Sequence, residues 1–213
     1  MTEVIISLTT IPPRFGGIFS VLESLVAQNA ARVVLVVPYH WTRFPDARGV
    51  PDLPPGVEVL RAQDQGPASK VLPTRGAYPD ADIVFCDDDC LYAPGWLDAL
   101  RSGPGVCAGS CFDVSRLRRD GARVAQGFAG VYVPASVPLP DHVPDAVRHA
   151  DDLWLSAWFE AYGHAITEVP LARRLVTPQS AEAPLQTGSR ARDYTIAATY
   201  IAEHLGIWPP LGG

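Results

Sequence analysis

The chain has 213 residues, of which 47% are hydrophobic and 19% charged. It can bury a core large enough for one compact domain, and its composition is not that of a disordered protein. Its formal net charge of −6 excludes the dense Lys/Arg surface that binds nucleic-acid backbones without sequence specificity. It begins without a signal peptide and contains no run of about 18 apolar residues, so we expect neither export nor a transmembrane segment.

The first elements have the pattern of a βαβ unit. An apolar run at residues 4–8 predicts a buried strand, the helical spacing of apolar residues predicts a helix over 17–28, and a second apolar run predicts a strand at 32–37. Residues 38–56 are rich in Pro, Asp and Arg without periodicity, which predicts a surface loop. A third short strand should follow at 57–60.

An acidic triplet follows the next strand. We expect a helix over 68–77 and then an apolar strand at 82–86, which leads directly into Asp87-Asp88-Asp89. Pro94 marks the start of a helix that ends near Leu100. The triplet should therefore lie at the carboxyl end of a strand.

The second half of the chain predicts a change in the sheet. Two strands separated by a polar, Arg-rich hairpin or loop should make the sheet mixed, after which a proline-rich linker leads to further elements. These elements are strands at 106–110, 128–133 and 165–169, a linker at 134–144, a helix from about 151 and a last helix over 193–205. The sequence thus predicts an α/β fold with a mostly parallel, mixed central sheet flanked by helices, in a single domain over 1–213.

The acidic triplet is the main candidate for chemistry. In an open α/β sheet, ligands bind outside the carboxyl ends of the strands. Three adjacent carboxylates repel one another, and a divalent cation compensates them. Because Mg²⁺ and Mn²⁺ prefer carboxylate oxygens and keep positions open for phosphates, Asp87-Asp88-Asp89 predicts a metal-diphosphate site. The alternative is a solvated acidic turn that caps the next helix.

A second acidic group, Asp151-Asp152, stands at the first turn of a helix rich in aromatic residues. An ionised carboxylate beside a pocket can take the proton from an attacking hydroxyl group. The alternative is a helix cap, because Asp accepts hydrogen bonds from the free amides at a helix start.

Two further segments carry polar groups suited to an anionic ligand. The chain has sixteen arginines but one lysine, Lys70, which a tight turn over 65–70 delivers near a helix start. That lysine could neutralise a diphosphate, or it could be a surface residue without a role. After the first strand, the hydroxyls of Thr9 and Thr10 and the guanidinium of Arg14 could meet a nucleotide.

Cysteines and aromatic residues each allow two interpretations. Four cysteines form two C-x3-C pairs, which suit reduced thiols better than a zinc site. These are Cys86, Cys90, Cys107 and Cys111. Five aromatic residues could form a platform that stacks on a sugar, although core positions are the commoner role. They are Tyr92, Trp96, Phe128, Trp154 and Trp158.

Taken in order, these segments resemble the bacterial glycosyltransferases of the GT-A fold that contain a DxD motif and are similar to family 2. The resemblance rests on residues 7–15, 66–70, 87–89 and 151–156 and spans roughly 4–169. The order of the four segments is more specific than any one of them, since a DxD motif alone is common.

The resemblance assigns roles to the acidic groups. It implies that Asp87 and Asp89 hold Mn²⁺ or Mg²⁺ against the diphosphate of the donor, and that Asp87 or Asp88 contacts the ribose. It also implies that Asp152 is the catalytic base of an inverting enzyme, with Asp151 as its neighbour and possible substitute.

The remaining donor contacts follow from the same resemblance. Nucleotide-sugar binding is implied for Thr9, Thr10, Arg14 and Lys70. Residues 1–100 would form the nucleotide-binding half and residues 101–213 the acceptor side.

The function implied is a metal-dependent, hexosyltransferase-like enzyme. It would move a sugar from a nucleotide diphosphate sugar to a hydroxyl of a sugar, lipid-linked glycan or small molecule, in surface glycan or glycoconjugate synthesis. It would act in the cytoplasm or at the inner face of the membrane.

Two alternatives use the same residues. Haloacid-dehalogenase-like phosphatases also combine a strand-end DxD, a lysine and a later Asp pair around Mg²⁺, but there the DxD follows the first strand and precedes the lysine. The other alternative is a module that binds a nucleotide sugar without turnover.

Overall fold

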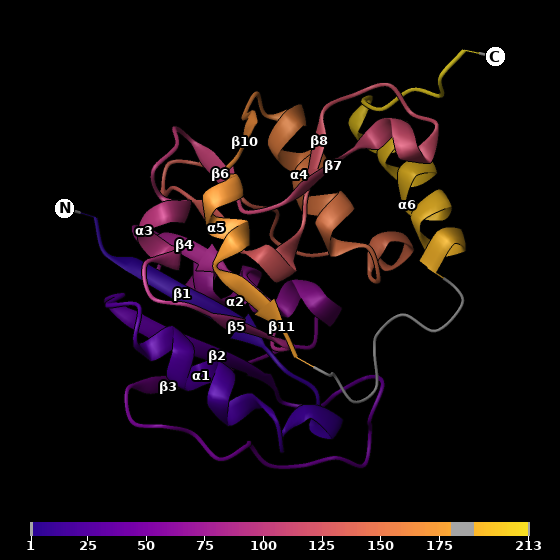
Figure 1. Ribbon diagram of the computed structural model, residues 1–213. Helices are drawn as coiled ribbons and strands as arrows, with labels where there is room; N and C mark the ends of the chain where they lie inside the picture. Colours follow the sequence, from indigo (N-terminus) through magenta and orange to yellow (C-terminus); the bar gives the residue numbers. More distant parts are fainter. Residues whose placement is uncertain (1, 180–189, 213) are drawn as a thin grey trace.

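The computed structural model describes residues 2–179 and 190–212, and a seven-stranded sheet forms its centre (Figure 1). In sheet order, β10-β6-β9-β4-β1-β2-β3, strand β9 is antiparallel to both of its neighbours and every other pair is parallel. The strands are β1 (Val4–Thr9), β2 (Arg32–Pro38), β3 (Val57–Ala62), β4 (Asp82–Phe85), β6 (Val106–Ala108), β9 (Val131–Val133) and β10 (Ile166–Glu168). The predicted mostly parallel, mixed sheet is confirmed.

Two small antiparallel sheets complete the strands of the described residues. Strands β7 (Cys111–Asp113) and β8 (Arg123–Ala125) form the Arg-rich hairpin expected between β6 and β9. Strand β5 (Cys90–Tyr92) pairs with β11 (Val176–Pro178), a pairing that the sequence analysis did not predict. This pairing ties the segment after the acidic triplet to a strand in the chain's second half.

Helices cover both faces of the sheet. Along β1, Ile6 packs with α1 (Ile18–Val26), whereas Ile5 packs on the opposite face, because successive side chains of a strand point to opposite sides. The core on the first face also includes α3 (Trp96–Leu100) and α5 (Pro170–Arg174). The other face is covered by α2 (Leu72–Ala77), α4 (Asp151–Ala161) and α6 (Arg190–Leu205).

Several predicted boundaries differ from the structure, among them the start of the last helix, which is Arg190 and not 193, and three differ for local reasons. The helix expected over 68–77 is divided into a 3-10 turn, η2 (Gly66–Lys70), and α2, whose second residue is a proline that suits a helix start. The strand expected from 128 begins only at Val131, because η4 (Gly127–Ala129) precedes it. Gly95, with φ of 84°, delays α3 to Trp96.

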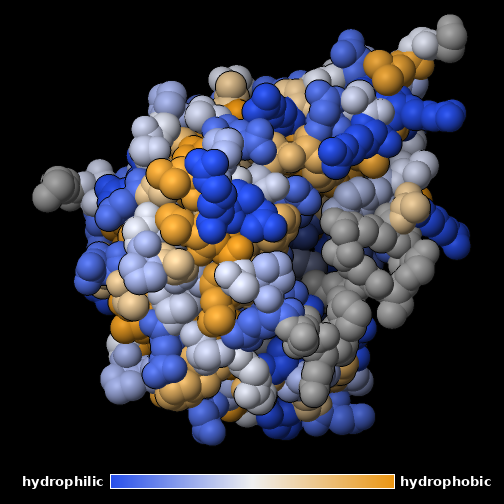
Figure 2. Space-filling model, in the orientation of Figure 1, coloured by the Kyte–Doolittle hydropathy of each residue, from blue (hydrophilic) through white to orange (hydrophobic). Residues whose placement is uncertain are grey.

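Hydrophobic surface on the face shown in Figure 2 lies around α3 and α5 and is interrupted by hydrophilic side chains. Within the described residues, large exposed hydrophobic side chains are spread over several elements. In that same part of the chain, helices long and apolar enough to span a bilayer are absent.

Candidate active site

A pocket of about 720 Å³ opens where β1 to β4 end, and residues that follow each of these four strands line it. The walls also include η2 and the first turns of α4 and α6. All nine site residues expected from the sequence lie in its lining. The carboxyl edge of the sheet therefore gathers segments that are far apart in the chain, as open α/β sheets do around a ligand.

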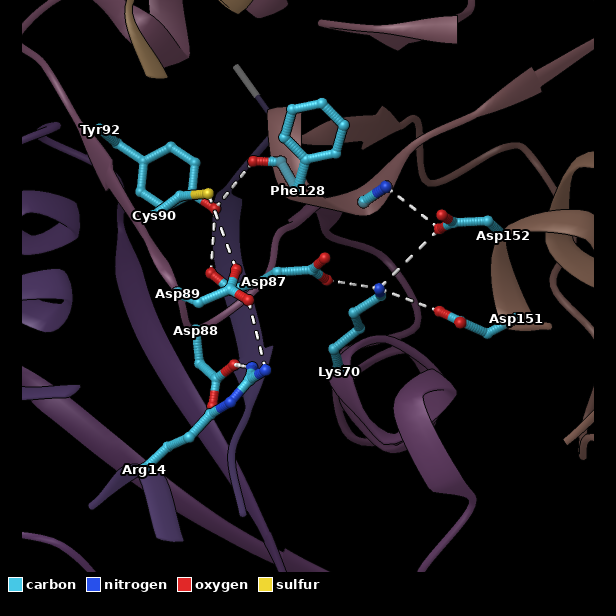
Figure 3. A network of polar contacts seen from close by, with 11 residues as sticks. Arg14, Lys70, Asp87, Asp88, Asp89, Cys90, Tyr92, Phe128, Asp151 and Asp152 are labelled. Atoms are coloured by element: carbon cyan, nitrogen blue, oxygen red, sulfur yellow. Dashed lines mark hydrogen bonds and ion pairs between the residues drawn. The ribbon is translucent and has the colours of Figure 1, made fainter. Parts of the chain in front are cut away.

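Asp88 joins the acidic triplet to the loop after β1. Its carboxylate pairs with Arg14 Nη1 (Figure 3). It also accepts a hydrogen bond from Thr10 Oγ1 at 2.7 Å, and all three side chains are buried. Burial raises the pKa of Asp88, although Arg14 and Thr10 oppose this. Through these two contacts Asp88 holds the loop after β1 against the triplet, and its predicted contact with the ribose stays a prediction.

Asp87 and Asp89 are the more accessible members of the triplet. Their side chains are 33% and 29% exposed, against 6% for Asp88. Asp87 accepts a hydrogen bond from Lys70 Nζ at 2.7 Å, and Asp89 lies 3.3 Å from Arg14 Nη2. These two carboxylates can therefore face a ligand, whereas Asp88 holds the loop.

Lys70 lies between the triplet and the second acidic group (Figure 3). Its Nζ is 2.9 Å from Asp151 Oδ2 and 4.0 Å from Asp152 Oδ1, in addition to its contact with Asp87. Burial lowers the pKa of Lys70, but the charges of Asp151, Asp87 and Asp152 outweigh it and hold the pKa well above the ordinary value. Lys70 is thus a buried ammonium shared by three carboxylates, and not the surface residue of the alternative interpretation.

Asp152 has the environment of a proton acceptor. Burial and the neighbouring charge of Asp151 raise its pKa to about 7, against the opposing effect of Lys70. Its Oδ1 accepts a hydrogen bond from the backbone N–H of Gly127 at 3.1 Å. A carboxylate with a pKa near neutrality is suited to general-base catalysis.

The helix-cap alternative for Asp151-Asp152 is wrong. Helix α4 has Ala150 as its N-cap and no side-chain cap hydrogen bond. Both carboxylates lie inside the first turn, at the positive end of the helix dipole, and line the pocket.

The pocket lining also contains residues for which the sequence pattern predicts no role. Trp41 is buried and donates from Nε1 to the backbone oxygen of Thr10 at 3.2 Å, beside Phe44 in the lining. Arg148 bridges to the loop after β3, donating to the Asp64 carbonyl at 2.6 Å and lying 3.3 Å from its carboxylate. The aperiodic loop 38–56 gave no signal for Trp41 beyond its being an isolated aromatic residue.

The carboxylates fit a divalent cation that takes further ligands from a substrate. Within residues 2–179 and 190–212, no three His, Cys, Asp or Glu side chains are grouped to hold a metal by themselves. Asp87 and Asp89 provide two accessible carboxylates, and Mg²⁺ is commonly bound by one or two carboxylates together with waters and phosphates. The donor set therefore suits a metal-phosphate complex better than an isolated ion.

The aromatic residues do not form a sugar platform. Within the part of the chain that the structure describes, none of the five candidates lines the pocket, and Tyr92, Trp96 and Trp154 are buried in the core. The core interpretation is the right one for these three. The four cysteines are free thiols, three of them buried.

The sheet order, the helices on both faces and the acids at the carboxyl edge define a Rossmann-like α/β fold of the GT-A type. No protein-family model matches the chain, and no curated protein matches its sequence.

Solved structures show the similarity in fold. Glucosyl-3-phosphoglycerate synthase from Mycobacterium tuberculosis in complex with Mn²⁺, uridine diphosphate (UDP) and phosphoglyceric acid matches with a TM-score of 0.60 and 16% identity, over 98% of this chain and 80% of that one. Its complex with Mn²⁺, UDP-glucose and phosphoglyceric acid matches with a TM-score of 0.53 and 13% identity, over 98% and 81%. A structure described as a mycobacterial protein matches with a TM-score of 0.56 and 11% identity, over 98% of this chain and 76% of that one. At these identities, the similarity establishes the fold and leaves the family-2-like assignment a prediction.

Proposed function

We propose that this chain is a metal-dependent glycosyltransferase that moves a sugar, in the first instance from UDP-glucose or a related donor, to a hydroxyl acceptor. One observation carries the proposal. Two acidic groups, 87–89 and 151–152, face the same pocket at the carboxyl edge of a GT-A fold, with Lys70 between them. Complexes of glucosyl-3-phosphoglycerate synthase, whose fold is similar, include UDP or UDP-glucose with Mn²⁺ and UDP with Mg²⁺, which supports this donor class.

Asp87 and Asp89 would hold Mn²⁺ or Mg²⁺ against the donor diphosphate. When bound, the cation would act as a Lewis acid on the departing diphosphate. Seven carboxylates against four Lys and Arg side chains line the pocket among the described residues, so it carries a surplus of negative charge that a cation would offset. Thr9, Thr10 and Arg14 would form the wall against which the nucleotide lies.

Asp152 would take the proton from the attacking hydroxyl. Its pKa of about 7 allows it to be ionised before the reaction and to hold the proton afterwards. Lys70 and the Gly127 amide would keep its carboxylate in place, with Asp151 as its charged neighbour. A base on the acceptor side suits direct displacement, so we propose inversion at the anomeric carbon.

The two halves of the chain would divide the work. Residues 1–100 contribute the acidic triplet and the nucleotide wall, and residues 101–213 contribute the acid pair and the acceptor side, together acting as one domain. We further propose that the donor sugar is a hexose and that the acceptor belongs to glycan or glycoconjugate synthesis. The enzyme would act in the cytoplasm or at the membrane periphery.

Donor turnover tests the proposal. Purified protein is incubated with UDP-glucose and Mn²⁺, with phosphoglyceric acid as the first acceptor, and UDP release and the product anomer are measured. We expect Mn²⁺-dependent release and an inverted product. Replacing UDP-glucose by GDP- and ADP-sugars then shows which nucleotide is preferred.

The same assays separate the alternatives. Hydrolysis of p-nitrophenyl phosphate that is lost in Asp87→Asn would favour the phosphatase. Tight binding of UDP-glucose with no release of UDP under any of these conditions would favour the non-catalytic module.

A further inference from the structure

Because Gly127 has no side chain, the Lys70 ammonium can occupy the space beside it. A Cβ atom on residue 127 would lie 2.4 Å from Lys70 Nζ, 3.2 Å from Lys70 Cε and 3.0 Å from Asp87 Oδ1. These distances are well below van der Waals contact for the lysine head. Any side chain at 127 would therefore push the ammonium away from Asp87.

The backbone of Gly127 contacts the second acidic group at the same time. Its N–H donates to Asp152 Oδ1 at 3.1 Å, while Lys70 bridges from Asp87 to Asp151. One residue of the turn η4 thus borders both the triplet and the acid pair. No pattern in the sequence marks this position.

Two hydrogen bonds hold the backbone of the turn that contains Gly127 in place. Trp96 Nε1 donates to the Ala129 carbonyl at 3.0 Å, and the hydroxyl of Tyr92 donates to the Phe128 carbonyl at 3.2 Å. Both aromatic side chains are buried in the core. Because Nζ is the free end of a flexible side chain, an added methyl group at 127 would move the lysine and leave the turn in place.

We propose that Gly127 is a positioning residue, which admits the Lys70 ammonium between Asp87 and the acid pair and orients Asp152 through its amide. The proposal deepens the proposed function, since it depends on Asp87 and Asp152 being the donor and base sites. Gly127 itself does not contact the reacting atoms.

Because Lys70 is the chain's single lysine, the position of its ammonium can be measured without turnover. The rate at which N-hydroxysuccinimidyl acetate modifies Lys70 is followed by mass spectrometry, with the N-terminal amine as internal reference. In the wild type, burial and the ion pairs protect the amine. We expect Gly127→Ala to be modified at least about tenfold faster, because reactivity follows access and loss of the ion pairs.

Gly76→Ala is the matched control, since its Cβ would meet no atom within 4 Å and its φ is not in the left-handed region. Its Lys70 should be modified at the wild-type rate. If Gly127→Ala is also modified at the wild-type rate, the proposal is overturned.

A double-mutant cycle tests whether Gly127 acts through Lys70. UDP release from UDP-glucose with Mn²⁺ is measured for the wild type, Gly127→Ala, Lys70→Met and the double variant. We expect Gly127→Ala to lower kcat about tenfold or more with little change in KM, since misplacement of a catalytic group costs turnover. The double variant should be no slower than Lys70→Met alone.

A general structural defect would instead add to the effect of Lys70→Met, and that result would refute the proposal. A wild type that releases no UDP would refute the proposed function, while the modification rates would still decide whether Gly127 positions Lys70.

Discussion

Lys70 shares one positive charge among Asp87, Asp151 and Asp152, at 2.7, 2.9 and 4.0 Å. Lys70 is only 4% exposed, so its ammonium loses hydration and the carboxylates replace the water. The neighbouring carboxylates hold the pKa of Lys70 well above its ordinary value, and burial together with the charge of Asp151 raises that of Asp152.

Lys70→Met should destabilise the fold strongly. Removing one partner of a buried ion pair leaves uncompensated charge, which costs about 3–5 kcal/mol. Urea denaturation at pH 7.5 measures the loss in the free energy of unfolding. A loss no larger than that of exposed Arg43→Met would show that the buried cluster contributes little.

Asp152→Asn should slow turnover far more than it weakens donor binding. A general base contributes roughly 10²–10⁴-fold to the rate, whereas the donor contacts are proposed for other residues. Steady-state kinetics and calorimetry with UDP and Mn²⁺ separate the two effects. Turnover near the wild-type value would exclude Asp152 as the base.

The pH dependence of turnover follows from the pKa of Asp152, which burial and Asp151 raise to about 7. Only the ionised form accepts a proton, so kcat/KM should rise with pH and level off above about 8. One unit below the pKa, the rate should be about tenfold lower than the plateau. A flat profile between pH 5.5 and 8.5 would contradict the assignment.

The same raised pKa predicts a cost in stability. A carboxyl whose pKa is raised on folding contributes its full stability below its unfolded value of 3.8 and loses it as the pH rises through about 7. Asp152→Asn keeps the amide contact and removes this charge. Its Tm, relative to the wild type, should therefore increase between pH 4 and pH 8.

Thermal unfolding of Asp152→Asn across that range makes the comparison, with exposed Asp141→Asn as control. A variant less stable than the wild type at pH 8 would show that the charged form of Asp152 is stabilising.

Among the elements, Gln28 connects the end of α1 with β5 and α3. Just beyond α1, its Nε2 donates to the carbonyls of Tyr92 and Ala93 at 2.9 and 3.1 Å, and its Oε1 accepts from Leu97 N–H in α3 at 3.2 Å. These hydrogen bonds of Gln28, here called the Gln28 clamp, hold β5, which directly follows the acidic triplet. The Gln28 clamp lies outside the pocket lining.

Gln28→Met should therefore lower stability without changing nucleotide affinity. Leaving buried backbone groups unpaired costs about 1–3 kcal/mol. Urea denaturation gives the stability, with exposed Gln63→Met as control, and calorimetry with UDP and Mn²⁺ gives the affinity. Equal stability of the two variants would show that the clamp is dispensable.

Elements with strong patterns could be predicted, and short irregular ones could not. Strands β1, β2 and β4 are almost wholly buried, so their apolar runs were visible in the sequence. The turn η4 has three residues, and β11 pairs with β5 across more than eighty residues of chain. A turn of three residues is too short to show a periodic pattern. Pairing over such a distance leaves no local pattern either, so the sequence predicts neither element.

At the level of the whole molecule, the site could be predicted where it follows the strands. Thr10 directly follows β1, Asp87 lies two residues after β4, and parallel strands bring their carboxyl ends to one edge. The contact of Arg148 with Asp64 depends on how loops meet in three dimensions. The same is true of the packing of the Lys70 ammonium against Gly127. No spacing in the sequence records such contacts.

Metal-dependent binding of UDP tests the account most directly. At a nucleotide concentration about a hundred times its Kd, UDP with Mn²⁺ should raise the Tm by about 5–10 °C, since binding to the folded state alone adds about 2.7 kcal/mol. UDP with EDTA should give a much smaller shift, and Asp89→Asn should lose the Mn²⁺-dependent part. An equal shift with and without Mn²⁺, unchanged in Asp89→Asn, would contradict a metal held between the triplet and a diphosphate.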